Sequence, residues 1–174
     1  MKKHYLSLLI LSLLSFGGCG KLFSTYCDRV AKGTADRNWI NEEVNASIPF
    51  SKVSYRNPAA GTPGAVCVTA QGLTAETAAG KNFSIEIADA NEKVLVKQTG
   101  KSAAQPINTE NQPKLWSGKD QTNKSKFEST ECFNIQKLDP YVKVKVKRLS
   151  SGEIDESKLW NNAAYCQDRH RQSS

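Results

Sequence analysis

The chain has 174 residues, of which 39% are hydrophobic and 24% are charged, and this composition excludes an intrinsically disordered protein. The length allows one hydrophobic core of ordinary domain size. Lys and Arg exceed Asp and Glu by a formal charge of +7, which falls to +5 when Lys2 and Lys3 are left out. An excess this small favours solubility and attraction to anionic surfaces, and it does not by itself indicate nucleic-acid binding.

The first residues have the organisation of an export signal. Lys2 and Lys3 form a short basic start, residues 5–14 are apolar apart from two serines, and small residues follow. The apolar run is shorter than the roughly 20 residues that a membrane-spanning helix needs. The sequence therefore predicts a signal peptide over residues 1–18 and disfavours a transmembrane anchor.

Cys19 follows the run Phe16-Gly17-Gly18, and this segment resembles the lipobox of bacterial lipoproteins. In that family a cysteine after two small residues becomes the lipidated first residue of the mature chain. Phe16 departs from the usual leucine, and spirochaete lipoproteins are similar in tolerating bulkier residues there. The resemblance implies a covalent lipid on Cys19, and two acyl chains anchor stably because each buried methylene contributes about 0.8 kcal/mol. The alternative is ordinary cleavage after Gly17, which would leave Cys19 as a plain cysteine.

The lipobox also implies a location in the cell envelope. Gly20 and Lys21 follow Cys19, and a lipoprotein with no Asp directly after its lipidated cysteine is similar to those sent to the outer membrane of enteric bacteria. Residues 19–35 are rich in Gly, Ser, Thr and Lys, and they are predicted to be a tether between lipid and domain. The membrane is therefore an expected partner, reached through the covalent lipid.

Five cysteines stand in the chain, and an even four remain if Cys19 carries lipid. Cysteines of exported proteins are commonly oxidised to disulfides, and four cysteines allow three pairings. We favour a bond between Cys67 and Cys132, which would join two core strands. The second bond would then tie Cys27 to Cys166 and hold the two ends of the domain together; four reduced thiols are the alternative. No Cys-x-x-Cys pair is present, so a zinc ribbon or a thioredoxin-type site has almost no support.

Residues 36–168 are predicted to form a single β-rich domain. Its first residues, 36–44, are ambiguous, because Asp36 can cap a short helix that carries Trp39. Alternating apolar residues and intervening turn-forming runs then predict four short strands in chain order. These strands span residues 51–56, 65–70, 83–87 and 93–98.

The second half of the domain begins with a long polar stretch at residues 99–126. Compact domains seldom carry so much structureless loop, so either a short strand forms around Leu115 and Trp116 or the stretch is a functional surface. Strands are expected at residues 126–135 and 141–149, the latter with valines alternating with lysines. Residues 158–166 suit either helix or strand. Residues 169–174 are predicted to be a frayed polar tail.

Short alternating strands separated by turns predict a mainly β fold, an antiparallel β-sandwich stapled by disulfides and with little helix. The separation of Cys67 and Cys132 suits an immunoglobulin-like arrangement. Two details argue against a true member of that family. Trp116 lies well past the position expected after the first cysteine, and no Tyr stands two residues before Cys132. No family is identified for the mature domain.

The domain body contains no histidine, because His4 lies in the predicted signal and His170 in the tail. This removes the commonest general base, the Ser-His and Cys-His nucleophile pairs, and most metal sites built on imidazole. We therefore expect no enzyme activity, no cofactor and no metal. Neighbouring carboxylates are the remaining catalytic candidates, and no motif supports them: Glu128 with Glu131, and Asp155 with Glu156.

A basic stripe is the most marked surface feature, formed by Lys143, Lys145, Lys147 and Arg148. Alternation puts the three lysines on one face of a strand while the intervening valines enter the core. Such a row can bind an anionic glycan or phospholipid headgroups, or it can simply keep a strand soluble. Nucleic acid is not an expected partner, because the protein is exported and this face lacks interleaved aromatics.

Three tryptophans are candidates either for stacking on sugars or for core packing. Trp39 and Trp160 are expected in the core. Trp116 has polar neighbours, among them Lys114 and Lys119. If Trp116 is exposed, the stretch that contains it becomes the leading binding loop.

These features together predict a lipid-anchored lipoprotein of the cell envelope whose domain is a non-enzymatic binding or adhesion module. An anionic glycan, or an envelope or host protein, is the expected ligand. Two alternatives stay open. One is a structural or assembly lipoprotein that contacts another envelope protein, and the other is a secreted enzyme that uses carboxylates.

Overall fold

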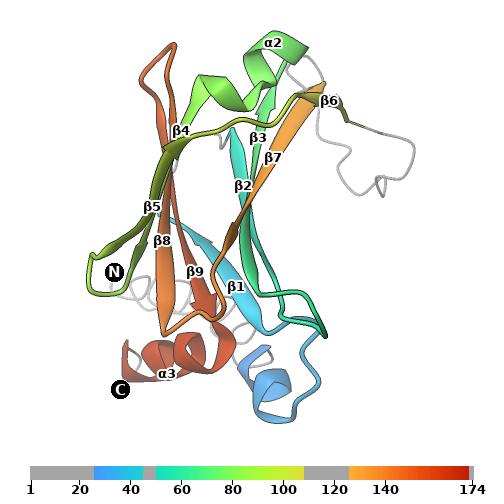
Figure 1. Cartoon of the computed structure of the whole chain (residues 1–174). Coiled ribbons are helices and arrows are strands. Elements are labelled where there is room, and N and C mark those ends of the chain that lie inside the picture. The colour runs from blue at the N-terminus through green and yellow to red at the C-terminus, as the bar shows by residue number, and fades with distance from the viewer. Residues whose placement is uncertain (1–25, 45–49, 108–125, 173–174) are drawn as a thin grey trace, which may run out of the picture.

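Two antiparallel β-sheets face each other in the computed structural model, which describes residues 26–44, 50–107 and 126–172 (Figure 1). In spatial order, the first sheet contains β1 (Trp39–Glu43), β9 (Ile154–Asn161), β8 (Tyr141–Arg148), β4 (Phe83–Asp89) and β5 (Val94–Thr99). The second sheet contains β2 (Ser51–Arg56), β3 (Ala65–Gly72), β7 (Phe127–Asn134) and β6 (Gln105–Pro106). The prediction of a mainly β, antiparallel sandwich stapled by disulfides is confirmed.

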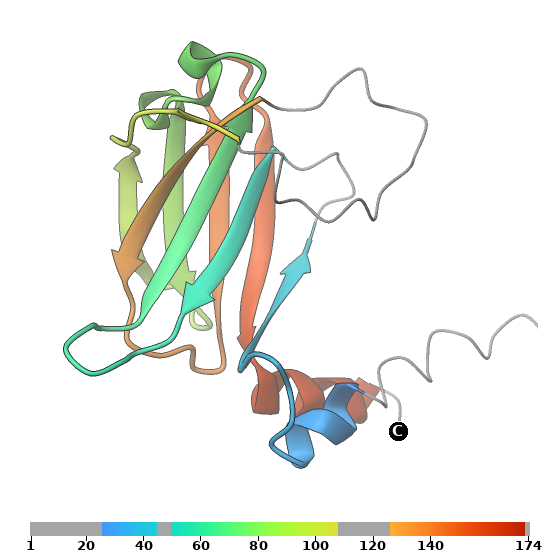
Figure 2. The same cartoon turned by 90° about the vertical axis from the view of Figure 1, so that its right-hand side faces the viewer.

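Helices lie at the two ends of the sandwich (Figures 1 and 2). One end, called the α2 end below, carries α2 (Ala75–Ala78), the 3-10 turn η1 (Gly80–Asn82) and the turn between β8 and β9. The opposite end, the α3 end, carries α3 (Asn162–Gln172) beside the helical residues 26–31. No helix within the described ranges is long and apolar enough to cross a bilayer.

The main core fills the space between the sheets and follows the two-residue period of the strands. In β8 the valines point inward and are at most 2% exposed, while the lysines between them are not buried. Removing this much apolar surface from water is the main favourable term in folding. The largest fully buried side chains belong to four strands and are Val66, Val68, Phe83, Ile87, Val144, Val146 and Leu159.

A second, smaller core lies at the α3 end, on the outer face of the first sheet. Trp160 is its centre, with the ring centroid of Tyr165 at 6.0 Å and that of Tyr141 at 4.4 Å. The predicted disulfide between Cys27 and Cys166 closes this cluster. It fixes residues 26–31 against α3, so the last part of the predicted tether belongs to the folded domain.

The second disulfide joins Cys67 to Cys132, as predicted, but it does not cross the core. The two residues face each other on β3 and β7, which are neighbouring strands of one sheet. Cys67 is half-buried and Cys132 is exposed, so the bond lies on the outer face of that sheet. An immunoglobulin disulfide instead joins the two sheets through the core. The immunoglobulin-like placement of this disulfide is therefore wrong.

Residues 36–44 contain no helix, so the short helix that Asp36 could have capped does not form. They contain β1, which pairs with β9 from Trp39 opposite Asn161 to Glu43 opposite Ser157. Alternation sends the side chain of Trp39 to the main core and that of Ile40 to the second core. Burial on both faces of the strand therefore outweighs the local capping signal.

Residues 158–166 are both strand and helix. β9 continues to Asn161, whose side-chain Oδ1 accepts a hydrogen bond from the Ala163 amide at 3.0 Å, and α3 begins at Asn162. This bond satisfies one of the amides that the first turn of a helix leaves open. The expected fraying of the tail is wrong up to Gln172, because α3 runs that far and Arg169 pairs with Glu42.

The main core predicts a large cost for Leu159→Ala. Leu159 is 0% exposed, and truncating a buried leucine costs about 2–5 kcal/mol because it removes apolar contacts and leaves a cavity. Leu95→Ala, on the exposed side of edge strand β5, is the matched control and should change the free energy of unfolding by less than about 0.5 kcal/mol. Urea denaturation measures both values. Equal effects of the two substitutions would contradict this placement of the core.

Candidate binding site

The three lysines of the predicted basic stripe lie on the outer face of the first sheet. Lys143, Lys145 and Lys147 alternate with buried valines along β8. Acidic side chains compensate two of them: Lys143 is bonded to Glu92, and Lys145 lies 3.6 Å from Glu156. The hydrogen bond that Lys143 donates to the Glu92 carboxylate raises the pKa of the Lys143 amine. The stripe is thus interleaved with acids, and its net positive charge is smaller than the sequence suggests.

Arg148 does not belong to this stripe. It occupies the same parity as the buried valines of β8, so its side chain leaves the sheet on the opposite face from the lysines. Its guanidinium carbon lies 4.3 Å from the ring centroid of Phe50, and its Nη1 donates to Glu153 Oε2 at 2.6 Å. The sequence prediction of a four-residue basic row is therefore wrong at Arg148. Strand parity alone was the signal that separates it from the lysines.

The tryptophans divide between described and undescribed parts of the chain. Trp39 packs against the main core and Trp160 is 6% exposed, so the prediction that both are core residues is confirmed. Trp116, Lys114 and Lys119 lie outside the described residues. Within the predicted long stretch, Gln105–Pro106 forms the short strand β6 against β7.

The two candidate carboxylate pairs are separated by strand geometry. Residues an odd number of positions apart on a strand point to opposite faces. Asp155 is buried toward the second sheet while Glu156 pairs with Lys145 on the outer face. Glu128 lies 3.4 Å from the side-chain amide of Gln71. The partners of each candidate pair therefore lie on opposite faces of their strands.

Glu131 instead holds the chain that follows β5. Its Oε1 accepts hydrogen bonds from the backbone amides of Lys101 and Ser102. Burial alone would raise the pKa of the Glu131 carboxyl, but the two backbone hydrogen bonds outweigh burial and hold that pKa below its ordinary value. The carboxylate therefore has a structural partner in its charged form.

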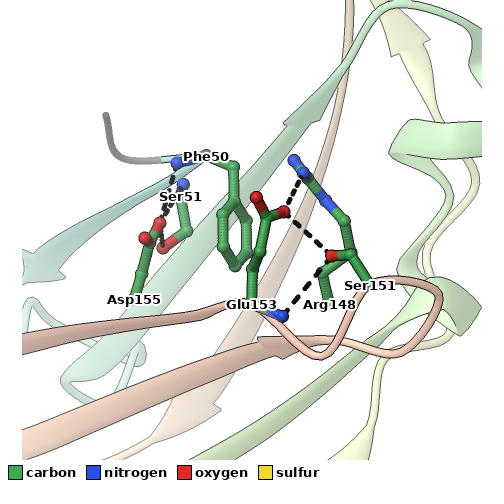
Figure 3. A network of polar contacts seen from close by, with 6 residues as sticks. All are labelled: Phe50, Ser51, Arg148, Ser151, Glu153 and Asp155. Carbon is green, nitrogen blue, oxygen red and sulfur yellow. Dashed lines mark hydrogen bonds and ion pairs between the residues drawn. The ribbon is translucent and has the colours of Figure 1, made fainter. Parts of the chain in front are cut away.

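Asp155 makes the most extensive polar contact between the sheets (Figure 3). Its Oδ2 accepts from the backbone amides of Phe50 and Ser51, each at 2.8 Å, and from Ser51 Oγ at 2.9 Å. Asp155 is 5% exposed, so these bonds replace the water that the carboxylate loses on folding. They hold the start of β2 against β9. The sequence offered no signal for this contact, because the partners are more than 100 residues apart.

The ring of Phe50 lies between the Asp155 contacts and the pair formed by Arg148 and Glu153 (Figure 3). Ser151 adds to that pair by donating from Oγ to Glu153 Oε2 at 2.9 Å. The Arg148 side chain is therefore held from two sides, by a carboxylate and by an aromatic face. Its Nε and Nη2 have no partner among the described residues.

A depression of about 500 Å³ opens beside Arg148 at the α2 end, and it is called the Arg148 depression below. This volume is within the range of about 300–1,000 Å³ that small-molecule sites occupy. Its wall is formed by the segment that follows β3 and by the β8–β9 turn. The side chains in it that matter for its chemistry are Gln71, Leu73, Glu76, Asn82, Arg148 and Ser150.

The local sequence determines the turn between β3 and α2 that lines the depression. Thr74 and Thr77 form a reciprocal capping box at the start of α2. Gly72 lies directly beneath the helix, where an added Cβ would stand 2.7 Å from Thr77 Oγ1 and 2.8 Å from the Ala78 amide nitrogen. Only glycine allows this close approach of backbone to backbone. The sequence feature behind this turn is the spacing of Thr74 and Thr77, which departs from the usual Ser/Thr-x-x-Glu/Gln pattern and which the strand-based prediction did not use.

No group of His, Cys, Asp and Glu side chains that could hold a metal ion occurs among the described residues. No protein-family model, curated protein or solved structure matches this chain. The chemistry of the Arg148 depression is therefore inferred from its own side chains.

Asp155→Ala is predicted to destabilise the fold by about 2–4 kcal/mol, because it leaves buried backbone amides of Phe50 and Ser51 without an acceptor. The control is Glu156→Ala, one residue along and on the outer face, which should cost no more than about 1 kcal/mol. Thermal unfolding at neutral pH measures both variants. A smaller loss for Asp155→Ala than for its neighbour would contradict a connecting role for this carboxylate.

Glu131→Gln is predicted to change how stability depends on pH. The folded-state pKa of Glu131 lies below the ordinary value of 4.5, so its charged form stabilises the fold above that pH, and this contribution is lost as pH falls through the folded-state pKa. The Gln variant should be the less stable protein at pH 7, and the difference should shrink below pH 4.5. Urea midpoints over this range test it. Parallel pH profiles for the two proteins would show that Glu131 contributes nothing of this kind.

Proposed function

We propose that this chain is a lipid-anchored, non-enzymatic binding module of the bacterial cell envelope. The observation that carries the proposal is the pairing of cysteines. Two disulfides account for every cysteine in the described ranges, and the fifth cysteine of the sequence is Cys19 in the lipobox-like segment. Disulfides of this kind form in oxidising compartments, which agrees with an export signal ahead of Cys19.

The positions of the two ends support a binding role. Tyr26, the first described residue, lies at the α3 end, and Cys19 precedes it by seven residues, which span at most about 25 Å when fully extended. The Arg148 depression is lined by residues of α2 and of the β8–β9 turn. Both elements lie at the opposite, α2 end (Figure 1). A lipid on Cys19 would therefore hold the α3 end near the bilayer, and the depression would face away from it. This is a useful orientation for capturing a ligand outside the membrane.

A structural or assembly lipoprotein is the second candidate, and exposed apolar side chains favour it. Leu73, Leu149 and Ile154 are between 41% and 54% exposed and all lie near the α2 end. Exposed apolar side chains that cluster mark protein contacts more often than those scattered singly. Under this alternative the partner is another envelope protein and the α2 end is its docking surface.

Lipidation is tested by Cys19→Ser in the full chain. We expect complete loss of palmitate labelling, loss of the added acyl mass and release from the membrane fraction, because the anchoring methylenes are gone. Ser24→Ala, five residues later, is the matched control and should label and partition as the original chain does. Unchanged mass and membrane retention of the serine variant would sink the proposal.

Orientation and membrane face are tested separately by proteolysis of intact cells. A protein displayed outward from the outer membrane should be degraded by added protease, whereas one that faces the periplasm should survive until the outer membrane is permeabilised. Immunodetection of the chain before and after permeabilisation distinguishes the two. Resistance under both conditions in a chain that is cleaved once purified would contradict an outer-membrane location.

A further inference from the structure

We propose that the Arg148 depression binds an uncharged saccharide unit. The proposal rests on the binding role inferred above and names its ligand class. It moves that role away from the lysine stripe on β8, since acids compensate Lys143 and Lys145 there. It also replaces the anionic glycan expected from sequence with a neutral one. The reasons are the charge of the depression, its uncommitted hydrogen-bonding groups and its apolar rim.

The charge of the depression disfavours an anion. Arg148 is the cation in its wall, and Glu153 neutralises it at 2.6 Å. Glu76 lines the same depression with an exposed carboxylate that has no partner among the described residues. A phosphate, sulfate or carboxylate group would therefore meet one negative charge that nothing offsets, and like charges repel at short range. A neutral ligand avoids this cost.

The hydrogen-bonding groups left over suit hydroxyl groups. Arg148 offers the donors Nε and Nη2, Glu76 offers two acceptor oxygens, and the Ser150 hydroxyl offers both. The side-chain Nδ2 of Asn82 donates a hydrogen bond to the backbone carbonyl of Glu76, which leaves the Oδ1 of Asn82 as an acceptor. Donors and acceptors thus both line one depression. A sugar hydroxyl donates and accepts at once, so a ring with several hydroxyls can satisfy both kinds.

An apolar side chain completes the site. Leu73 is 54% exposed at the wall of the depression, directly after the glycine that ends β3. A pyranose ring presents C–H groups on its faces and hydroxyls at its edge. Covering Leu73 with such a face removes apolar surface from water without burying a charge. Leu149, 50% exposed on the neighbouring β8–β9 turn, extends the apolar rim.

The polar groups are already held in place before a ligand arrives. Phe50 and Glu153 fix the Arg148 guanidinium, and the capping box of Thr74 and Thr77 fixes the turn that carries Glu76. Asp155 in turn fixes the backbone of Phe50. Groups that are ordered in advance lose less conformational freedom on binding, and a small ligand therefore binds more tightly than it would to flexible side chains.

The test uses the full chain, extracted in detergent, and four neutral disaccharides: cellobiose, maltose, lactose and N,N′-diacetylchitobiose. Saturation-transfer NMR detects binding, and calorimetry gives the dissociation constant. Glucuronic acid against glucose tests the charge preference. We expect saturable binding of at least one neutral disaccharide, and weaker binding of glucuronic acid than of glucose, because Glu76 repels the added carboxylate.

Three variants locate the binding. Glu76→Ala removes an exposed acceptor and Leu73→Ser removes the apolar wall, and each should weaken binding about tenfold. Asp28→Ala, an exposed acid at the α3 end, is the matched control and should bind as the original chain does. Circular dichroism confirms that the variants are folded, which is expected because all three side chains are exposed.

The proposal is overturned if none of the four disaccharides binds, if Glu76→Ala and Leu73→Ser bind as the control does, or if glucuronic acid binds more tightly than glucose. The last result would identify an anion site on Arg148 instead. Capture of an extended peptide at the same residues, with no sugar binding, would overturn it in favour of a protein partner. Failure of the proposed lipid anchor would instead appear as unchanged mass and membrane retention of Cys19→Ser, which is a different residue and readout and would leave these sugar-binding outcomes unaffected.

Discussion

A carboxylate buried between the sheets connects β9 of the first sheet to the start of β2 in the second sheet. Asp155 on β9 accepts hydrogen bonds from two backbone amides and one hydroxyl at the start of β2. Because the carboxylate is buried, losing these hydrogen bonds would leave it unsatisfied. This contact fixes Phe50, whose ring supports the guanidinium of Arg148. The contact between β9 and β2 and the wall of the Arg148 depression therefore depend on the same buried carboxylate.

The two disulfides act at different places, and neither crosses the main core. Cys27–Cys166 ties residues that are 139 positions apart and closes the second core around Trp160. Cys67–Cys132 links neighbouring strands on the outside of the second sheet. Inter-sheet packing is thus provided by apolar side chains and by Asp155. Each disulfide joins residues that are far apart in sequence, and such a cross-link stabilises the fold mainly by restricting the unfolded chain.

The proposed lipid anchor and the proposed ligand site belong to opposite ends of the molecule. The α3 end gathers α3 and the helical residues 26–31 (Figure 2), together with the second core. The Arg148 depression and two exposed leucines, Leu73 and Leu149, belong to the α2 end. Three lysines on the outer face of the first sheet have acidic partners: Lys97 pairs with Glu86, Lys143 with Glu92 and Lys145 with Glu156. Such pairs add little stability, but they leave the sheet face without a strong field. The polar groups at the α2 end that lack partners among the described residues are the reason for placing the proposed ligand there.

The sequence by itself determined the strands with clear two-residue alternation and the even set of four cysteines available for disulfides, and the pairing of Cys67 with Cys132 and of Cys27 with Cys166 was the one it favoured among three. These features depend on periodicity and on an even cysteine count, both of which are local or arithmetic properties. Only the tertiary structure decided that residues 39–43 form a strand, that Arg148 leaves the lysine row to stack on Phe50, and that Asp155 bonds across to β2. Each of these depends on partners far away in the chain, and their free energy comes from burial and desolvation that exist only once the two sheets have met.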